Sequence, residues 1–233
     1  MTTIPATDLM ASLRSGNSTA PRLTWYGPDS ERVELSGRVL DNWVAKTSNL
    51  LQDELDAEPG MRLRLALPAH WKTMVWALAG WQLGLETVLD GGPADFLATD
   101  NPEGDVNQYS AVIAVALPAL AMRWTGELPT GCLDYAAEVR SHGDVFMPHT
   151  DPDPSARAVV THQRGAVLHR NLLTGFALPH SEGARLHVPA GSGLESALAN
   201  ALGAWQQGGS VVMTHPDVAL TAKLMADERI HGS

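Results

Sequence analysis

Apolar residues recur at steps of three and four between residues 39 and 55, which is the spacing of one face of an α-helix. Ser36 precedes them, and a serine hydroxyl is a preferred acceptor for the free N–H groups at a helix start. Pro59 disfavours helical geometry at the residue before it, and Gly60 permits a sharp turn. The pattern predicts an amphipathic helix that begins at Ser36 and ends within residues 56–60. Its expected core stripe is Val39, Leu40, Trp43, Val44, Thr47, Leu50, Leu51 and Leu55, and its expected solvent side is Asp41, Lys46, Asn49, Gln52, Asp53 and Glu54.

The next segment predicts a strand, a buried helix and a second strand. Residues 61–67 alternate and then become continuously apolar, which is typical of a strand that enters a sheet interior. Residues 69–84 carry few charges, as a helix covered on most sides does, and residues 86–89 form a short apolar run. Parallel neighbours need a crossover of this size, so the two strands are expected to pair in parallel.

The rest of the chain continues the alternation of strands and helices. Further strands are predicted at 111–117, 156–160 and 210–213, and further helices at 165–178, 193–207 and 217–227. Ser192 or Gly193 is expected to cap the second of these helices, and Asp217 the third. The predicted fold class is therefore α/β, with mainly parallel sheets flanked by helices.

Prolines recur within residues 147–154, and this makes the segment the best candidate for a linker between two subdomains. It divides the chain into a first α/β subdomain, residues 1–150, and a second, residues 151–233. One compact domain is the alternative.

Composition and charge narrow the classes of function. The chain has 233 residues, 44% of them apolar, which is enough for a packed core. Its 16 basic and 26 acidic residues give a net charge of −10, a field that repels nucleic acid. No stretch approaches the roughly 18 apolar residues of a membrane span, and the first residues do not read as a secretion signal. We expect a cytoplasmic protein with no membrane span and no nucleic-acid partner.

The order of residues also resembles a known family. Residues 21–26, 33–38, 49–51, 58–60 and 63–68 resemble the start of the adenylate-forming superfamily, which includes acyl-CoA synthetases, peptide-synthetase adenylation domains and luciferases. Residues 157–173 resemble that family's phosphate-loop strand and the helix behind it, and residues 188–194 and 208–212 its next helix and strand. The resemblance implies the fold of the family's N-terminal subdomains, with ATP or AMP as the candidate cofactor.

The chain also departs from that family where the family binds phosphate. Only four residues, none of them glycine, separate Val160 from Gly165, where the family has a Ser/Thr/Gly-rich loop that wraps ATP phosphates with backbone N–H groups. Arg164 stands where the family has a lysine, and the histidine expected after Pro189 is missing. The family's adenine-binding tyrosine loop, ribose-binding aspartate and C-terminal domain with the catalytic lysine would follow Ser233. We therefore expect no complete adenylating ligase and assign no catalytic residues.

Two places remain candidates for anion contacts. Arg164 and Gly165 lie where the family touches phosphate, and an arginine can clamp an anion there. Gly191, Ser192 and Gly193 open a predicted helix, whose free N–H groups and dipole favour negative charge. A solvated arginine and a plain helix cap are the alternative interpretations.

Other chemistry finds less support in the sequence. The nine histidines lack the spacing of a zinc helix, so we expect no metal site, and Cys132 is expected to be an ordinary thiol. Trp71, Trp76 and Trp81 are spaced by five, which favours core packing. The alternative is that some of them line an apolar cavity at the carboxyl ends of the strands.

The sequence thus predicts a degenerate, non-catalytic relative of the adenylate-forming enzymes that binds a small molecule or a protein partner. The first alternative is one part of a split enzyme that a second chain completes, with Arg164 on phosphate. The second is a purely structural subunit of an oligomer. An apolar face left open by the absent half of the family fold would favour a homo-oligomer or a partner.

Overall fold

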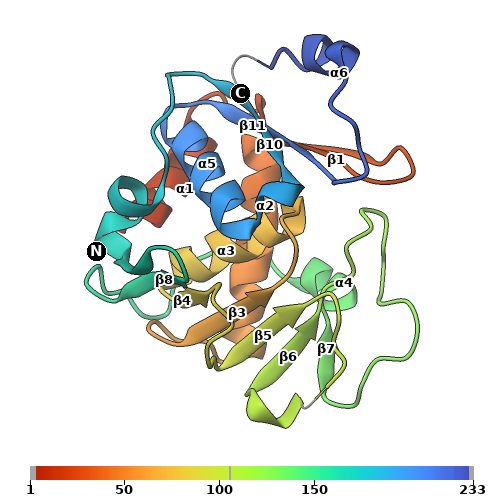
Figure 1. Cartoon of the computed structure of the whole chain (residues 1–233). Helices are drawn as coiled ribbons and strands as arrows, with labels where there is room; N and C mark the ends of the chain where they lie inside the picture. The colour runs from red at the N-terminus through yellow and green to blue at the C-terminus, as the bar shows by residue number, and fades with distance from the viewer. Residues whose placement is uncertain (1–3, 105, 231–233) are drawn as a thin grey trace.

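The computed structural model describes residues 4–104 and 106–230, and the strands within them form two sheets (Figure 1). The smaller sheet has the order β10–β11–β1–β2, in which β2 is antiparallel to β1 and the other pairs are parallel. Its strands are β1 (Pro21–Tyr26), β2 (Arg32–Ser36), β10 (Arg185–Pro189) and β11 (Ser210–Thr214). Strands from the first part and from the last part of the described chain therefore lie in one sheet.

The larger sheet has the order β7–β6–β5–β3–β4–β8–β9, and every pair except β8 with β9 is parallel. Its strands are β3 (Arg62–Ala66), β4 (Glu86–Val88), β5 (Phe96–Thr99), β6 (Ala111–Ala114), β7 (Cys132–Asp134), β8 (Arg157–Thr161) and β9 (Gly165–Leu168). The strands predicted at 61–67, 86–89, 111–117, 156–160 and 210–213 are confirmed as β3, β4, β6, β8 and β11. The predicted parallel pairing of β3 with β4 is also confirmed.

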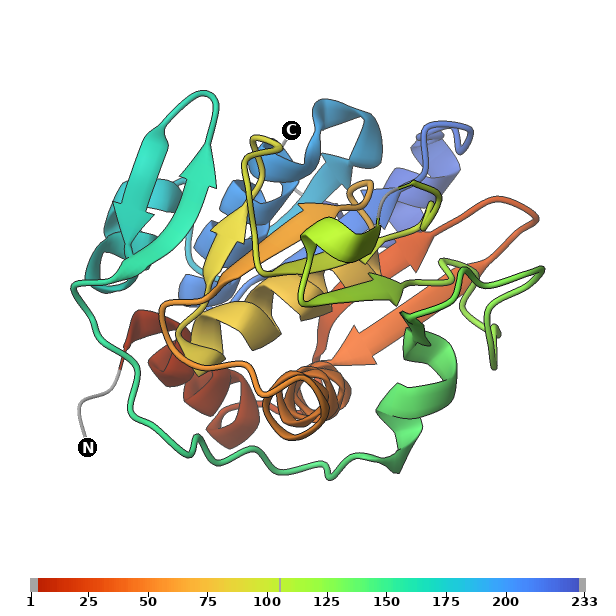
Figure 2. The same ribbon diagram turned by 90° about the horizontal axis from the view of Figure 1, so that it is seen from below.

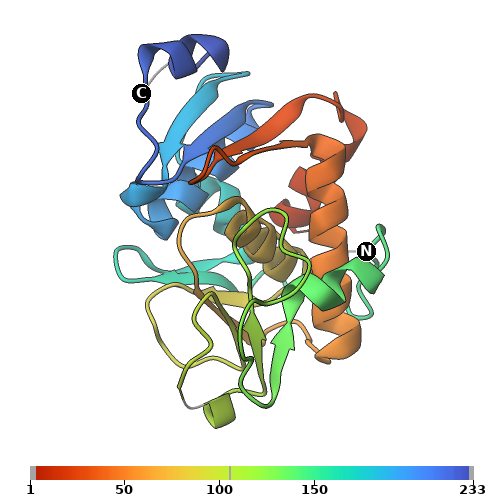
Figure 3. The ribbon, with the colours of Figure 1, turned by 90° about the vertical axis from the view of Figure 1, so that its right-hand side faces the viewer.

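The helix α3 (Trp71–Leu83) lies between the two sheets, as Figure 3 shows. Each of its residues is buried, which agrees with a helix that is apolar on all sides. It begins at His70 and ends at Gly84, whose φ of +89° suits a residue without a side chain. The predicted buried helix is therefore confirmed, and the fold class is α/β.

The remaining helices surround this core. They are α1 (Pro5–Ser15), α2 (Gly37–Asn49), α4 (Tyr135–Glu138), α5 (Leu194–Gln206) and α6 (Ala222–Asp227), with π-helical turns at Leu50–Glu54 and Leu172–Phe176 and 3₁₀ turns at Val106–Gln108, Val139–Ser141, His169–Asn171 and Ala190–Ser192. Ser36 caps α2 as predicted, because its Oγ accepts the N–H of Val39 at 3.3 Å. Gly193 caps α5, which confirms one of the two predicted positions.

The predicted solvent side of α2 is only partly exposed. Asp41, Asn49 and Gln52 are buried. Asp41 pairs with Arg14 of α1 at 2.8 Å, and the two amides bind the backbone of residues 143–149. These three residues were misassigned because periodicity does not reveal that another segment covers a polar helix face.

One predicted helix is wrong, and another begins later than predicted. The segment predicted as a helix from 165 to 178 begins with β9, which pairs with β8 from Thr161↔Gly165 onward, and short helical turns follow. Gly165 has a φ of +66°, which allows the tight turn of this hairpin. The last helix begins at Ala222 rather than 217, because Thr221 caps it, whereas the N–H of Asp217 binds the side chain of His215. The hydrophobic pattern had also not predicted α1, β1, β5, β7 or β10 as elements.

The residues just before the proline-rich linker candidate are bound to the surface of α2, and the candidate itself contacts the π-helical turn that follows, where Gln52 donates to the carbonyl of Met147 at 3.3 Å and accepts the N–H of His149 at 2.9 Å. Lys46 donates to the carbonyl of His142 at 2.5 Å, and Asn49 donates to the carbonyls of Gly143 and Val145. Figure 2 shows this segment passing along α2 and α1 toward the β8–β9 hairpin. Each sheet takes strands from both sides of residue 150. Whether residues 1–150 and 151–233 fold as separate units stays a prediction.

Candidate ligand-binding site

A cavity of about 930 Å³ lies between the two sheets, at the carboxyl ends of β1, β3, β6, β10 and β11. The carboxyl ends of parallel strands are where α/β proteins commonly hold their ligands. The lining residues are Trp25, Pro28, Asp29, the residues 31–35, Trp43, the residues 68–71, the residues 117–120, Ala190, His215 and Pro216. Six separate parts of the sequence therefore build one site.

A continuous row of aromatic rings forms one wall of the cavity. The ring centres of Trp43 and Trp71 are 5.4 Å apart, and those of Trp71 and His70 are 5.7 Å apart. The row continues from His70 to Trp25 at 4.5 Å and from Trp25 to His215 at 6.2 Å, both edge to face. Edge-to-face contacts of this kind fix the rings relative to one another. The wall is therefore largely preformed.

The three tryptophans of α3 have different surroundings. Trp71 lines the cavity, in agreement with the alternative left open by the sequence. Trp76 packs against Tyr135 at 4.9 Å, and Trp81 donates from Nε1 to the Thr87 hydroxyl and the Ala158 carbonyl. Trp76 and Trp81 belong to the core, as the main interpretation expected.

His70 caps α3 and faces the cavity as a neutral ring. Its Nδ1 accepts the backbone N–H of Lys72 at 3.1 Å, so the ring proton is on Nε2. Burial, with the nearby charges of Lys72 and His215, lowers the pKa of His70 to about 3. At neutral pH this ring is an uncharged hydrogen-bond donor.

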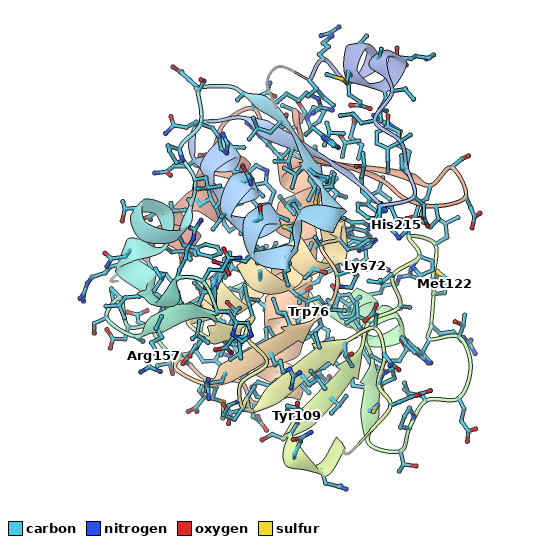
Figure 4. All side chains as sticks on the ribbon, viewed as in Figure 1. Lys72, Trp76, Tyr109, Met122, Arg157 and His215 are labelled. Atoms are coloured by element: carbon cyan, nitrogen blue, oxygen red, sulfur yellow. The ribbon has the colours of Figure 1, made fainter. Side chains whose placement is uncertain are left out.

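Lys72 and Glu31 hold the loop that follows β6. The Nζ of Lys72 donates to the carbonyls of Ala116 at 2.5 Å and Pro118 at 3.0 Å. Burial lowers the pKa of Lys72 to about 8, although the charge of Glu31 opposes this shift. Figure 4 shows Lys72 and His215 on the same side of the molecule, with Met122 farther out on this loop. The buried ammonium of Lys72 and the partly buried carboxylate of Glu31 thus position the loop at one edge of the cavity.

The tip of this loop is apolar and exposed. Leu120 is 90% exposed and lines the cavity, and Met122 is 65% exposed. Exposed apolar side chains beside a cavity are a common feature of binding sites. The same loop was assigned no role from the sequence.

The residues predicted to contact an anion are occupied by other partners. Arg164 donates to the carbonyl of Phe176, its guanidinium lies 5.3 Å from the centre of the Phe176 ring, and its Nε is 3.4 Å from Glu195 Oε1. Gly165 forms the β8–β9 turn. Binding of an anion by these residues stays a prediction.

The second predicted group, Gly191, Ser192 and Gly193, forms the 3₁₀ turn and cap before α5. The hydroxyl of Ser192 donates to the carbonyl of Pro189 at 2.8 Å. Glu195 lies in the first turn of α5, so its contact with Arg164 brings the two predicted groups near each other. The side chain that lies between the two groups is the carboxylate of Glu195, which is negative rather than positive. Neither group lines the 930 Å³ cavity.

The single cysteine does not line the cavity. Within residues 4–104 and 106–230, no group of three or more His, Cys, Asp or Glu side chains is placed to hold a metal ion. Cys132 is partly buried and free, and burial raises the pKa of its thiol. None of the described helices is long and apolar enough to cross a membrane.

Comparison with solved structures identifies the fold. The chain superposes on an acyl-CoA synthetase from Brucella canis with a TM-score of 0.73 and 18% identity, over 97% of this chain and 45% of that one. This chain has the fold of the N-terminal part of an adenylate-forming enzyme. An inhibitor-bound N-terminal domain of FACL13 from Mycobacterium tuberculosis matches over 97% of this chain and 61% of that one, with a TM-score of 0.70 and 13% identity. The anthranilate CoA ligase AuaEII, in complex with anthranoyl-AMP, matches over 91% and 44%, with a TM-score of 0.67 and 14% identity.

A sequence relative adds a closer match without a described activity. The chain is 40% identical over 161 residues to a TIGR03089 family protein of Mycobacterium tuberculosis, which is 66% of either chain. It thus aligns with just under two thirds of that relative's length. No family model matches the sequence.

Proposed function

We propose that this chain is a binding module that holds a small, largely apolar molecule in the 930 Å³ cavity and does not itself form acyl adenylates. The observation that carries the proposal is the preformed aromatic wall of Trp25, His70 and Trp71 beside a cavity large enough for such a molecule. Concave, mostly apolar sites with a few polar groups are the usual form of small-molecule sites.

The phosphate-binding region supports the second half of the proposal. The turn between β8 and β9 has three residues, none of them glycine, so its N–H groups are not arranged as in a glycine-rich phosphate-binding loop. Arg164, the one cation that the resemblance places on phosphate, is held by Phe176 and Glu195. Binding of a triphosphate there would have to break these contacts.

The structure of the cavity favours a small molecule over the other hypotheses from the sequence. A split enzyme would need Arg164 to be released to a phosphate, and a purely structural subunit would need no cavity. A protein partner that covers the exposed Leu120 and Met122 remains compatible with a ligand bound beneath them. A location in the cytoplasm is part of the same proposal.

The experiment uses N-phenyl-1-naphthylamine, an uncharged apolar dye whose fluorescence rises on entering an apolar site. We expect saturable binding to the folded chain. Ala119→Phe adds bulk to the cavity wall and should weaken binding about tenfold or more, which is a loss of about 1.4 kcal/mol. Ala121→Phe is the matched control, because Ala121 lies on the same loop but does not line the cavity.

Absence of saturable dye binding by the folded protein, or equal effects of the two variants, would overturn the binding proposal. The non-catalytic half has its own test, which is exchange of labelled pyrophosphate into ATP with a panel of carboxylic acids. We expect no exchange above the protein-free blank. Exchange that depends on an added acid would show that the chain forms acyl adenylates after all.

A further inference from the structure

The cavity wall carries mostly negative charge, whereas an acidic ligand would need a free positive charge. The wall contains the carboxylates of Asp29, Glu31 and Glu34, and among the described lining residues its only cationic side chain is Arg32. Arg32 is already bound: it donates to Glu34 at 2.7 Å, to Glu228 at 2.9 Å and to the Tyr26 hydroxyl at 3.0 Å. No free positive charge of the wall is therefore left for a ligand carboxylate or phosphate.

Lys72, which follows the cavity-lining Trp71, is also occupied. Its Nζ is bound to two carbonyls of the loop after β6, and its side chain does not line the cavity. A ligand anion that took this ammonium would release the loop at Ala116 and Pro118. Such an exchange loses two hydrogen bonds to a charged donor, and these are among the stronger ones in proteins.

The polar group that remains available to a ligand is a neutral donor. His70 lines the cavity and carries its ring proton on Nε2, because Nδ1 accepts the N–H of Lys72. The Nε1 of Trp71 is itself buried without accessible surface, so a ligand in the cavity does not reach it. The indole N–H of Trp25 is satisfied by Glu31 at 2.8 Å.

We infer that the cavity selects an aromatic ligand that carries a neutral hydrogen-bond acceptor, such as an amide, ketone or ring nitrogen, and no negative charge. The rings of Trp43, Trp71 and His70 contact the flat body of the ligand. The His70 imidazole N–H donates to its acceptor, and the carboxylates of Asp29 and Glu31 disfavour an anion. This inference rests on the proposed function and names the ligand class of the same site.

The test compares three compounds with one skeleton: 2-naphthamide, 2-naphthoate and 2-(aminomethyl)naphthalene. Calorimetric titration of the full chain at pH 7 is expected to give the tightest binding for the amide, about tenfold or more above the carboxylate. Asp29→Asn removes one carboxylate, and its backbone φ of 53° suits asparagine. Asp29→Asn should reduce the ratio of the affinity for the amide to the affinity for the carboxylate. Glu182→Gln, an exposed control away from the cavity, should leave this ratio unchanged.

A second pair of variants tests the donor. His70→Ser keeps a helix-capping acceptor but removes the imidazole N–H, and it should weaken the amide about fivefold, the usual effect of one lost hydrogen bond. The aminomethyl compound, which has no acceptor, should lose less affinity. His162→Ser is the control, because His162 is exposed and lies outside the cavity. Equal effects of the two variants on the amide would overturn the role of His70.

The outcomes separate this inference from the proposed function. Binding of the carboxylate as tightly as the amide, or more tightly, overturns the neutral ligand class while the binding module stands. Binding of none of the three compounds by folded protein contradicts both. Tighter binding of the aminomethyl compound than of the amide also overturns the inference, because a cation without an acceptor would then be preferred.

Discussion

The carboxylate of Glu31 accepts the backbone N–H of Ala119 at 2.6 Å, and this bond joins the smaller sheet to a loop of the larger one. The other oxygen of the same carboxylate accepts the indole N–H of Trp25 at 2.8 Å. One side chain thus fixes both an aromatic wall residue and the loop that borders the cavity on the opposite sheet. The shape of the cavity depends on this carboxylate.

Glu31→Ala is therefore expected to destabilise the protein and loosen the loop. It leaves the indole of buried Trp25 and the N–H of Ala119 unpaired, at a cost of about 2 kcal/mol in the free energy of unfolding. Urea unfolding measures the loss, and amide hydrogen exchange of residues 119–122 should become faster. Glu34→Ala is the control and should cost less than about 1 kcal/mol, since among residues 4–104 and 106–230 Glu34 pairs only with Arg32, at the surface. Equal losses for the two variants would contradict the role given to Glu31.

The buried neutral His70 makes stability depend on pH. Its pKa of about 3 in the folded chain lies below the unfolded value near 6.5, so the unfolded chain binds a proton first as the pH falls. The neutral ring of His70 therefore stabilises the folded chain fully above about pH 6.5. As the pH falls toward 3, this stabilisation is lost progressively, and the total loss in the free energy of unfolding is about 2 to 4 kcal/mol. His70→Asn keeps a capping acceptor without this titration, so the decline of its unfolding free energy between pH 7 and 4.5 should be shallower. His162→Asn, at an exposed turn, is the control, and its unfolding free energy should fall with pH as steeply as that of the native sequence. If the unfolding free energy of His70→Asn fell equally steeply, this account would be refuted.

Arg164 is expected to contribute to structure rather than to nucleotide binding. Arg164→Ala removes the contacts with Phe176 and Glu195 and should cost about 1 kcal/mol in the free energy of unfolding. Titration with ATP should give no saturable heat for either the native sequence or the variant. Arg170→Ala, at an exposed position of the following turn, should leave stability nearly unchanged. Saturable ATP binding that Arg164→Ala abolishes would instead support the split-enzyme alternative.

The position of the proline-rich segment can be tested with two glycines of the same backbone conformation. Gly84 and Gly60 have φ values of +89° and +90°, so alanine is strained at both. A Cβ at Gly84 would also lie 2.8 Å from the Cβ of Pro152, whereas nothing lies within 4 Å of one at Gly60. Gly84→Ala should therefore lower the free energy of unfolding by about 1 kcal/mol more than Gly60→Ala. Equal effects in thermal or urea unfolding would mean that Pro152 does not pack on the end of α3.

Local sequence patterns predicted the elements whose partners did not need to be known. The helices α2 and α3 follow from their periodicity, although the helical run that starts with α2 ends at Glu54, before the predicted residues 56–60, and β3, β4, β8 and β11 follow from short apolar runs. The edge strand β9 was missed because residues 165–168 show no alternation, and its identity depends on pairing with β8. The resemblance to the adenylate-forming enzymes predicted the fold of the whole chain.

The candidate site was largely beyond the reach of the sequence. Trp25, Glu31, His70 and His215 come together only when two sheets close around α3, and no spacing along the chain encodes that contact. One usable signal was present: His70 and Trp71 directly follow a buried strand, at the end where α/β proteins place ligands. The resemblance directed attention to Arg164 instead, because a family motif marks a position and does not show whether its side chain is free.

The most direct test of ligand binding in the cavity uses the indole N–H signals of the seven tryptophans in a two-dimensional ¹⁵N NMR spectrum. Each signal is first assigned by a Trp→Phe variant, and the native chain is then titrated with 2-naphthamide. We predict saturable shifts of the signals of Trp25, Trp43 and Trp71, which line the cavity, while Trp76, Trp81 and Trp205 in the core stay in place. A folded protein whose Trp25, Trp43 and Trp71 signals do not move, or move no more than those of the core tryptophans, would contradict a ligand site between the sheets.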